Sequence, residues 1–260
     1  MTPTPTPNPT MDRIRIVLVE TSLAANIGSV ARAMRNMGLT RLVLVAPRQF
    51  PHDDANTMAS GADELLAQAQ VVATLGEALA GSNLILGTTA RRRGMALPGS
   101  EPREAVAGLV AALAAAPAAE AALVFGRERS GLTNEELALC QRLIEIPTAG
   151  DHMSLNLAMA VLVLAYELQL ASREAPAPPG ERPEDLGPPA PADLMEGFYS
   201  HLETELLASG FLDADNPRHL MRRLRRLFGR AAPDARELNI LRGVLSALGS
   251  EPHGGGDEHG

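Results

Sequence analysis

The stretch IRIVLV at residues 14–19 is a nearly unbroken run of apolar, mostly β-branched side chains. Such a run is typical of a strand that is buried on both faces, as in a parallel sheet. Comparable runs follow along the chain, with helical patterns between them, at Arg41–Val45, Asn83–Leu86, Ala121–Phe125 and Arg142–Ile146. Because strands alternate with helices, the sequence predicts an α/β fold: a parallel sheet with helices on both faces.

Local signals mark where the intervening helices begin and end. Gly38 is placed to end the helix after the first strand, since glycine readily adopts the left-handed conformation that terminates helices. Thr74 with Glu77, and Thr133 with Glu136, have the spacing of capping boxes. We therefore expect two of the later helices to begin at these threonines.

The composition divides the chain into five parts. Residues 1–11 are rich in threonine and proline and are expected to be a disordered lead, whereas 12–172 form the sheet domain. Residues 173–192 are dense in proline, glycine and charge, which predicts a flexible linker. Helical periodicity returns in 193–248, so we expect a small helical unit there, and 249–260 is expected to be a disordered tail.

The chain of 260 residues has a formal net charge of −8, which at first argues against a nucleic-acid partner. The distribution of charge matters more than its sum. Six arginines lie in one short stretch that contains no acidic residue: Arg218, Arg222, Arg223, Arg225, Arg226 and Arg230. The alternative is a solvated helix face, but positive charges without counter-ions favour binding to RNA phosphates.

The remaining composition bears on the cellular compartment. No apolar run reaches the roughly 18–20 residues needed to span a bilayer. The single cysteine, Cys140, cannot form an internal disulfide and is expected to be packed in the interior. We therefore expect a cytoplasmic protein without a membrane partner.

Glycine and polar residues follow four of the predicted strands, at 20–32, 87–93, 126–132 and 147–156. In a doubly wound sheet, ligands bind in the crevice outside the carboxyl ends of the strands. Four such loops converging on one edge predict a binding site there.

The familiar nucleotide and metal signatures are missing from these loops. Gly28 stands alone after the first strand, without the G-x-G-x-x-G of dinucleotide-binding folds. Gly126 and Gly131 have the spacing of a P-loop, but Leu132 and Thr133 follow where a lysine and a serine or threonine are required. No second set of ligands accompanies residues 52–54 (HDD), so we expect no metal site.

Three motifs at this edge resemble those of the SpoU branch of the SPOUT RNA methyltransferases. They are NIGSVAR at 26–32, FGRE at 125–128 with GLTNEE at 131–136, and SLNLA at 154–158. The helical unit adds further matches, namely FY at 198–199, HLE at 201–203, RLRRLF at 223–228 and ELNILRG at 237–243. The combination resembles the TrmJ family of tRNA 2′-O-methyltransferases.

This resemblance implies an activity and an assembly. The enzyme would transfer a methyl group from S-adenosylmethionine to the ribose 2′-hydroxyl of the pyrimidine at nucleotide 32, in the anticodon loop of tRNA. It would be a homodimer whose active sites are completed across the interface. A deep trefoil knot would lie at the carboxyl end of the sheet domain.

The resemblance also implies roles for individual residues. Cofactor contacts would fall on Thr88, Thr89, Ala90, Gly126, Ile146, Met153, Ser154 and Leu155. Arg32 would be the main catalytic residue, supported by Asn26, Glu128 and Asn156. Since a guanidinium stays protonated in proteins, we expect Arg32 to clamp a phosphate and stabilise the developing 2′-oxyanion rather than to act as a base.

Other interpretations of these residues and of the whole chain stay open at this point. Glu128 could hold Arg127 or Arg129 in a salt bridge, and Ser154 or Asn156 could cap the final helix, with Ser154 favoured. The enzyme could act on rRNA or another tRNA position, because the three core motifs specify only the SpoU branch. The chain could also be a non-catalytic RNA-binding protein.

Overall fold

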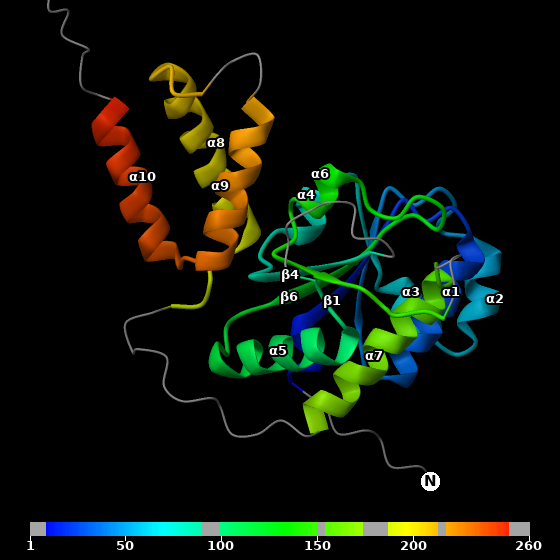
Figure 1. The fold of residues 1–260 in the computed structure, drawn as a ribbon. Coiled ribbons are helices and arrows are strands. Elements are labelled where there is room, and N and C mark those ends of the chain that lie inside the picture. The colour runs from blue at the N-terminus through cyan, green and yellow to red at the C-terminus, as the bar shows by residue number, and fades with distance from the viewer. Residues whose placement is uncertain (1–8, 90–98, 150–153, 174–186, 213–216, 250–260) are drawn as a thin grey trace, which may run out of the picture.

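In a computed structural model of the chain, residues 9–89, 99–149, 154–173, 187–212 and 217–249 are described. Within these residues the sheet has seven strands, all parallel, in the order β3-β2-β1-β6-β4-β7-β5. Figure 1 labels three of them, β1, β6 and β4. The strands are β1 (Ile14–Val19), β2 (Arg41–Val45), β3 (Gln70–Val72), β4 (Leu84–Thr88), β5 (Gly99–Ser100), β6 (Ala121–Phe125) and β7 (Arg142–Ile144). The predicted α/β fold with a parallel sheet is confirmed.

Two strands were not predicted from the sequence, and both lie at the edges of the sheet. β3 has three residues and pairs only with β2, whereas β5 has two residues and pairs only with β7. Segments this short cannot show a periodicity, so they depend on the neighbouring strand for their definition. β7 also ends at Ile144, two residues before the predicted end at Ile146.

Alternate side chains of the strands enter two separate cores. Ile16 and Leu18 of β1 pack in the core beneath one face, whereas Val17 and Val19 pack in the core beneath the other. Helices therefore cover both faces, as predicted (Figure 1). The first face is covered by η1 (Met11–Arg13), α1 (Ala24–Asn36), α2 (Asp53–Ala59), α3 (Asp63–Ala67), α5 (Pro102–Ala115) and α7 (Leu157–Arg173), and the second by α4 (Leu75–Leu79) and α6 (Asn134–Leu137).

The predicted helix signals are present with one modification. Gly38 follows the C-cap of α1 with φ +78°, as expected of a helix terminator. Thr133 and Glu136 form a complete capping box at α6. Thr74 accepts a hydrogen bond from the Glu77 amide, but the Glu77 carboxylate accepts from the amide of Ala73 rather than that of Thr74.

The remaining helices, α8 (Ala192–Ala208), α9 (Pro217–Ala231) and α10 (Ala235–Gly249), pack around a small core of their own. Phe198 lies at its centre, with its ring edge-to-face against Phe228 at a centroid distance of 4.8 Å. α8 contacts α4, so this helical unit sits beside the second face of the sheet (Figure 1).

The last residues of the predicted linker are ordered against both units. Within 187–192, the carbonyl oxygen of Pro189 accepts a hydrogen bond from the buried side chain of Asn83 in the sheet domain. The amide of Gly187 donates to Asp234 at 2.9 Å, and Asp234 also caps α10. The composition of this segment predicts flexibility, because composition carries no information on hydrogen-bond partners that are distant in the sequence, such as Asn83 and Asp234.

Two further expectations concern the chain as a whole. No helix in the described ranges is both long and apolar enough to cross a bilayer. β7 lies between β4 and β5 in the sheet, but residues 90–98 and 150–153, which would carry the knot crossing, are outside the described residues. The trefoil knot stays a prediction.

Close packing of α1 on α2 generates a stability prediction at Gly28. A Cβ atom there would lie 2.1 Å from the carbonyl oxygen of Ala55, so Gly28→Ala should lower the free energy of unfolding by about 1–3 kcal/mol. Gly243→Ala in α10 is the matched control, since nothing lies within 4 Å of its Cβ position. The control should gain about 0.5–1 kcal/mol from helix propensity. Denaturant unfolding checks both, and equal effects of the two substitutions would contradict the close contact.

Candidate active site

A crevice of about 400 Å³ lies at the carboxyl edge of the sheet, where β4, β6 and β7 end and α7 begins. Thr88 comes from the end of β4, Phe125 from the end of β6 and Ile144 from the end of β7. Residues 126–132 form one continuous wall. The crevice therefore lies at the edge of the sheet where the sequence predicted a binding site.

Six of the eight residues predicted to contact the cofactor line this crevice: Thr88, Thr89, Gly126, Ile146, Ser154 and Leu155. The other two, Ala90 and Met153, lie outside the described residues. The predicted residues come from four separate segments of the chain, and the fold brings these segments to one place.

A tight turn shapes the wall formed by residues 126–132. The amide of Arg127 donates to the carbonyl of Gly131 at 3.2 Å, and the Gly131 amide donates back at 2.9 Å. Gly131 has φ +68°, a conformation that favours glycine. A Cβ atom on Gly126 would lie 2.2 Å from the carbonyl carbon of Gly131, so only glycine fits at this position.

The predicted supporting residues Asn26, Glu128 and Asn156 form one hydrogen-bonded chain. The Asn26 side-chain amide donates to Glu128 at 3.1 Å, and the Asn156 amide donates to the oxygen of Asn26 at 3.1 Å. The Asn156 oxygen accepts from the amide of Ala158 at 2.9 Å, which makes Asn156 the cap of α7. Of the two residues suggested as the cap of this helix, Asn156 is confirmed, and the preference for Ser154 is wrong.

Glu128 is anchored at the amino end of α1. Its carboxylate accepts hydrogen bonds from the amides of Ser22 and Leu23 as well as from Asn26. Burial by itself would raise the pKa of Glu128, but hydrogen bonds to the charged form outweigh it and hold the pKa below its ordinary value. These bonds come first from the main-chain amide of Glu128 itself, and then from Asn26, Ser22 and Leu23. Glu128 is thus an ionised carboxylate that joins the wall of the crevice to α1.

The alternative role of Glu128 as a salt-bridge partner is wrong. Within the described residues, no ion pair joins Glu128 to Arg127 or Arg129. Arg127 instead pairs with Glu20 and Glu136.

Arg32 lies outside the crevice of its own chain. It is exposed on α1 and makes no hydrogen bond or ion pair with the described residues. Asn26 lies six residues earlier on the same helix and is buried, so the two side chains leave the helix on different sides. The sequence-based placement of Arg32 at the edge of the crevice is not reproduced within a single chain.

The arginines of α9 fall into two groups. Arg225 is paired with Glu196 of α8, with an Nη2 to Oε2 distance of 2.8 Å, and its guanidinium lies 4.3 Å from the ring centroid of Tyr199. The expectation that these arginines lack counter-ions is therefore wrong for Arg225, because a helix distant in sequence supplies the carboxylate. The side chain of Arg218 lies outside the described residues.

The other group of arginines in α9 reaches solvent. Arg223 and Arg230 are exposed, and Arg226 is partly exposed. Their spacing of three and then four residues places them on one face of the helix. Arg222 is also exposed, on the adjoining side.

Several crevice residues were not predicted, and most are apolar. Among them are Leu132, Leu137, Leu157 and Ala160. In the sequence, apolar side chains in helices and turns cannot be told from ordinary core residues.

Cys140 is buried as expected, and burial raises the pKa of its thiol to about 12. No cluster of three or more potential metal-binding side chains occurs in the described parts of the chain.

The sheet domain and the helical unit each match a family of known proteins. The model of the SpoU rRNA Methylase family matches residues 13–166, the sheet domain with its crevice, which makes the chain a methyltransferase of the SpoU class. The model described as tRNA methyltransferase TrmJ, C-terminal domain, matches residues 193–256. The chain belongs to the TrmJ family of tRNA methyltransferases.

Individual relatives agree with this assignment along nearly the whole chain. The tRNA (cytidine/uridine/adenosine-2′-O-)-methyltransferase TrmJ of Pseudomonas aeruginosa is 50% identical over 242 residues, covering 91% of this chain and 93% of that protein. The tRNA (cytidine/uridine-2′-O-)-methyltransferase TrmJ of Escherichia coli K12 is 49% identical and covers 94% and 98%. The crystal structure of TrmJ from Z. mobilis ZM4 matches with a TM-score of 0.77 and 37% identity, covering 90% of this chain and 98% of that one.

The anchoring of Glu128 generates a pH-dependent stability prediction. Glu128→Gln should lower the free energy of unfolding by about 1–2 kcal/mol at pH 7, because the hydrogen bonds from the two amides lose their charge assistance and one acceptor oxygen is replaced by a donor. The folded-state pKa is lowered, so this contribution is present above the unfolded pKa of about 4.3 and is lost as the pH falls through the folded value. The difference between the two proteins should therefore shrink below about pH 4.

Thermal unfolding between pH 3 and pH 7 measures this difference. Glu104→Gln, on the exposed side of α5, removes the same charge without those hydrogen bonds and serves as the control. A Glu128→Gln difference that is independent of pH would contradict the anchoring role.

Proposed function

We propose that this chain is a cytoplasmic enzyme that methylates the ribose 2′-hydroxyl of the pyrimidine at nucleotide 32 of tRNA, using S-adenosylmethionine. The observation that carries the proposal is the crevice: six residues that the TrmJ resemblance assigns to the cofactor line a single cavity. Position 32 rests on the family resemblance. Mapping the nucleotide modified after incubation with labelled S-adenosylmethionine and total tRNA tests it, and a product in rRNA or at another tRNA position would contradict it.

The crevice has the size and chemistry that S-adenosylmethionine requires. Its volume of about 400 Å³ falls in the range of small-molecule sites. Leu132, Leu137 and Ile146 offer apolar walls suited to an adenine ring, while Gly126 allows the main chain to approach closely. Thr88, Thr89 and Ser154 supply polar groups for the ribose and the amino-acid portion. When bound there, S-adenosylmethionine supplies an electrophilic methyl group.

Reaction then depends mainly on orientation and on the removal of one proton. The chain Glu128–Asn26–Asn156 holds the crevice wall, the start of α1 and the start of α7 in one arrangement. We assign these three side chains a positioning role, because their hydrogen bonds are made to one another and to the main chain. Arg32 stabilises the 2′-oxyanion while the proton passes to a phosphate oxygen or to water.

A homodimer would bring Arg32 to a crevice. Within a single chain, Arg32 is exposed and lies outside the crevice. Beside α1, the helix α7 exposes Met159, Leu162 and Tyr166 at helical spacing, with exposed fractions of 41–60%. Such an apolar stripe favours burial in an interface. We propose that this face pairs with a second copy and that Arg32 of the partner subunit completes each site.

The relatives differ in the range of bases at which they are named to act. The relative from Escherichia coli is named for cytidine and uridine, whereas that from Pseudomonas aeruginosa is named for adenosine as well. A ribose 2′-hydroxyl is common to all nucleotides, so the chemistry proposed for the crevice does not itself discriminate among bases.

The role of Arg32 generates a prediction about methyl transfer. Arg32→Ala should lower turnover at least about 100-fold, because a donor to the developing oxyanion is removed. Its affinity for S-adenosylmethionine should stay near normal, since Arg32 lies outside the crevice of its own chain. Arg35→Ala, also exposed on α1, is the matched control and should retain turnover. Near-normal turnover of Arg32→Ala would remove Arg32 from the mechanism.

Mixed dimers distinguish action across the interface from action within one chain. Ile146→Arg should fill the crevice and inactivate its own site. Co-expression of the Arg32→Ala and Ile146→Arg chains should restore about a quarter of wild-type turnover, because half of the dimers are mixed and each has one complete site. No recovery would mean that Arg32 acts within its own chain.

The exposed face of α9 generates a prediction about tRNA affinity. Replacing Arg223 and Arg230 together by glutamine should weaken tRNA binding and make the dependence of log K on log salt shallower by about 1 for each phosphate that is no longer neutralised. The control pair, Arg236 and Arg242 of α10, removes the same charge from another helix. Binding measured by filter retention at several salt concentrations checks this. Equal effects of the two pairs would contradict a specific role for the α9 face.

A further inference from the structure

The Arg127 guanidinium is bonded to protein acceptors through all three of its nitrogens, although 21% of the side chain is exposed. Nε donates to Glu20 at 3.0 Å, and Nη2 donates to the other oxygen of Glu20 and to Glu136 at 3.0 Å. Nη1 donates to Glu136 at 2.9 Å and reaches the carbonyl of Gly131 at 3.5 Å. These contacts use all five N–H groups of the side chain, so none remains for a ligand.

The two carboxylates come from two segments that are far apart in the sequence. Glu20 directly follows β1, with φ +46°, and its amide is bonded to the carbonyl of Val45. Glu136 belongs to α6 and also accepts from the amide of Thr133 at 2.7 Å as part of the capping box. One guanidinium therefore ties the end of β1 to the start of α6, with the turn between them.

That turn is the wall formed by residues 126–132. The main chain of Arg127 is bonded in both directions to Gly131, while its side chain reaches the carbonyl of the same residue. Arg127 lines the crevice together with its neighbours Gly126 and Glu128. The position of the wall thus depends on a side chain whose partners lie in other segments.

We infer that Arg127 is a positioning residue for the cofactor, acting with Glu20 and Glu136 to hold the wall of the crevice in its binding shape. This inference rests on the proposed placement of S-adenosylmethionine in the crevice. Its distinctive consequence concerns Glu20, which does not line the crevice: removing its charge should weaken cofactor binding through Arg127.

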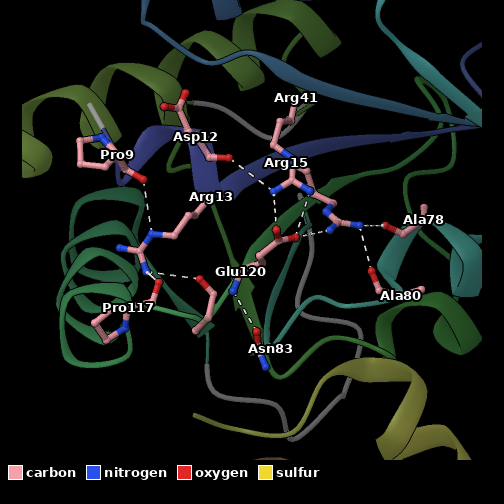
Figure 2. Close-up of polar contacts among 11 residues, drawn as sticks. Pro9, Asp12, Arg13, Arg15, Arg41, Ala78, Ala80, Asn83, Pro117 and Glu120 are labelled. Carbon is pink, nitrogen blue, oxygen red and sulfur yellow. Dashed lines mark hydrogen bonds and ion pairs between the residues drawn. The ribbon is translucent and has the colours of Figure 1, made fainter. Parts of the chain in front are cut away.

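Arg15, at the amino end of β1, provides a matched control. Figure 2 shows Arg15 of β1 beside Glu120, which also pairs with Arg41. Arg15 is buried, and its guanidinium donates to Glu120 and to the carbonyls of Ala78 and Ala80. Arg15 thus has a carboxylate partner and main-chain acceptors, as Arg127 does, but lies at the amino end of β1, away from the crevice. Replacing it tests what the loss of a structural arginine does by itself.

The experiment measures the dissociation constant of S-adenosylmethionine by calorimetry, together with thermal unfolding, for the full-length protein. Arg127→Met should weaken binding about tenfold or more. Arg127→Lys should weaken it less, because lysine keeps the positive charge but lacks the planar guanidinium that binds two carboxylates bidentately. Glu20→Gln should weaken binding about three- to tenfold. Arg15→Met should lower the unfolding temperature but change the dissociation constant less than about twofold.

A double-mutant cycle separates positioning from direct contact. If Arg127 acts through its ion pairs, the combined Arg127→Met and Glu20→Gln substitutions should weaken binding no more than Arg127→Met alone. Multiplicative effects would mean that Glu20 and Arg127 act independently and would overturn the inference. So would unchanged binding in Glu20→Gln, which keeps the test decisive even if Arg127→Met fails to fold.

Ile146→Arg distinguishes failure of this inference from failure of the proposed function. If Ile146→Arg leaves cofactor affinity unchanged, the crevice is not the cofactor site, and the proposed placement falls together with the inference. If Ile146→Arg abolishes binding while Arg127→Met and Glu20→Gln bind normally, the placement stands and only the positioning role is wrong.

Discussion

A parallel sheet has to bury both of its faces, because the crossover connections between its strands place helices on each side. β1 meets this constraint with Ile16 and Leu18 in one core and Val17 and Val19 in the other. Once both faces are covered, ligands can approach only at the edges where the strands end. The motif loops and the crevice gather at the carboxyl edge for this reason.

The polar groups around the crevice are fixed by the protein itself. Glu128 is held by main-chain amides and by Asn26, and Arg127 by Glu20 and Glu136. Charged groups that are partly withdrawn from water require such partners, since an unpaired buried charge is strongly unfavourable. The consequence is preorganisation: the wall of the crevice has its shape before a ligand enters, so less ordering is needed on binding.

The arginines of α9 have two different roles. Arg225 stacks on Tyr199 and pairs with Glu196, which joins α9 to α8. Arg223 and Arg230 stay in solvent and form a local positive surface on a protein of net charge −8. Local fields steer a polyanion more than the net charge does. The order of residues 187–192 then keeps this surface at a defined place beside the sheet.

The sequence by itself determined five of the seven strands and the capping box at Thr133. Through the family resemblance, its motifs also identified six of the residues that line the crevice. These signals could be found because each one lies in neighbouring positions of the chain. The tertiary structure alone decided the short edge strands, the carboxylate that neutralises Arg225, the exposure of Arg32 and the ion pairs of Arg127. These features depend on segments far apart in the chain: Glu20 and Arg127 are separated by 107 residues. No local pattern specifies such a partner, since only the packing of the sheet brings the two side chains together.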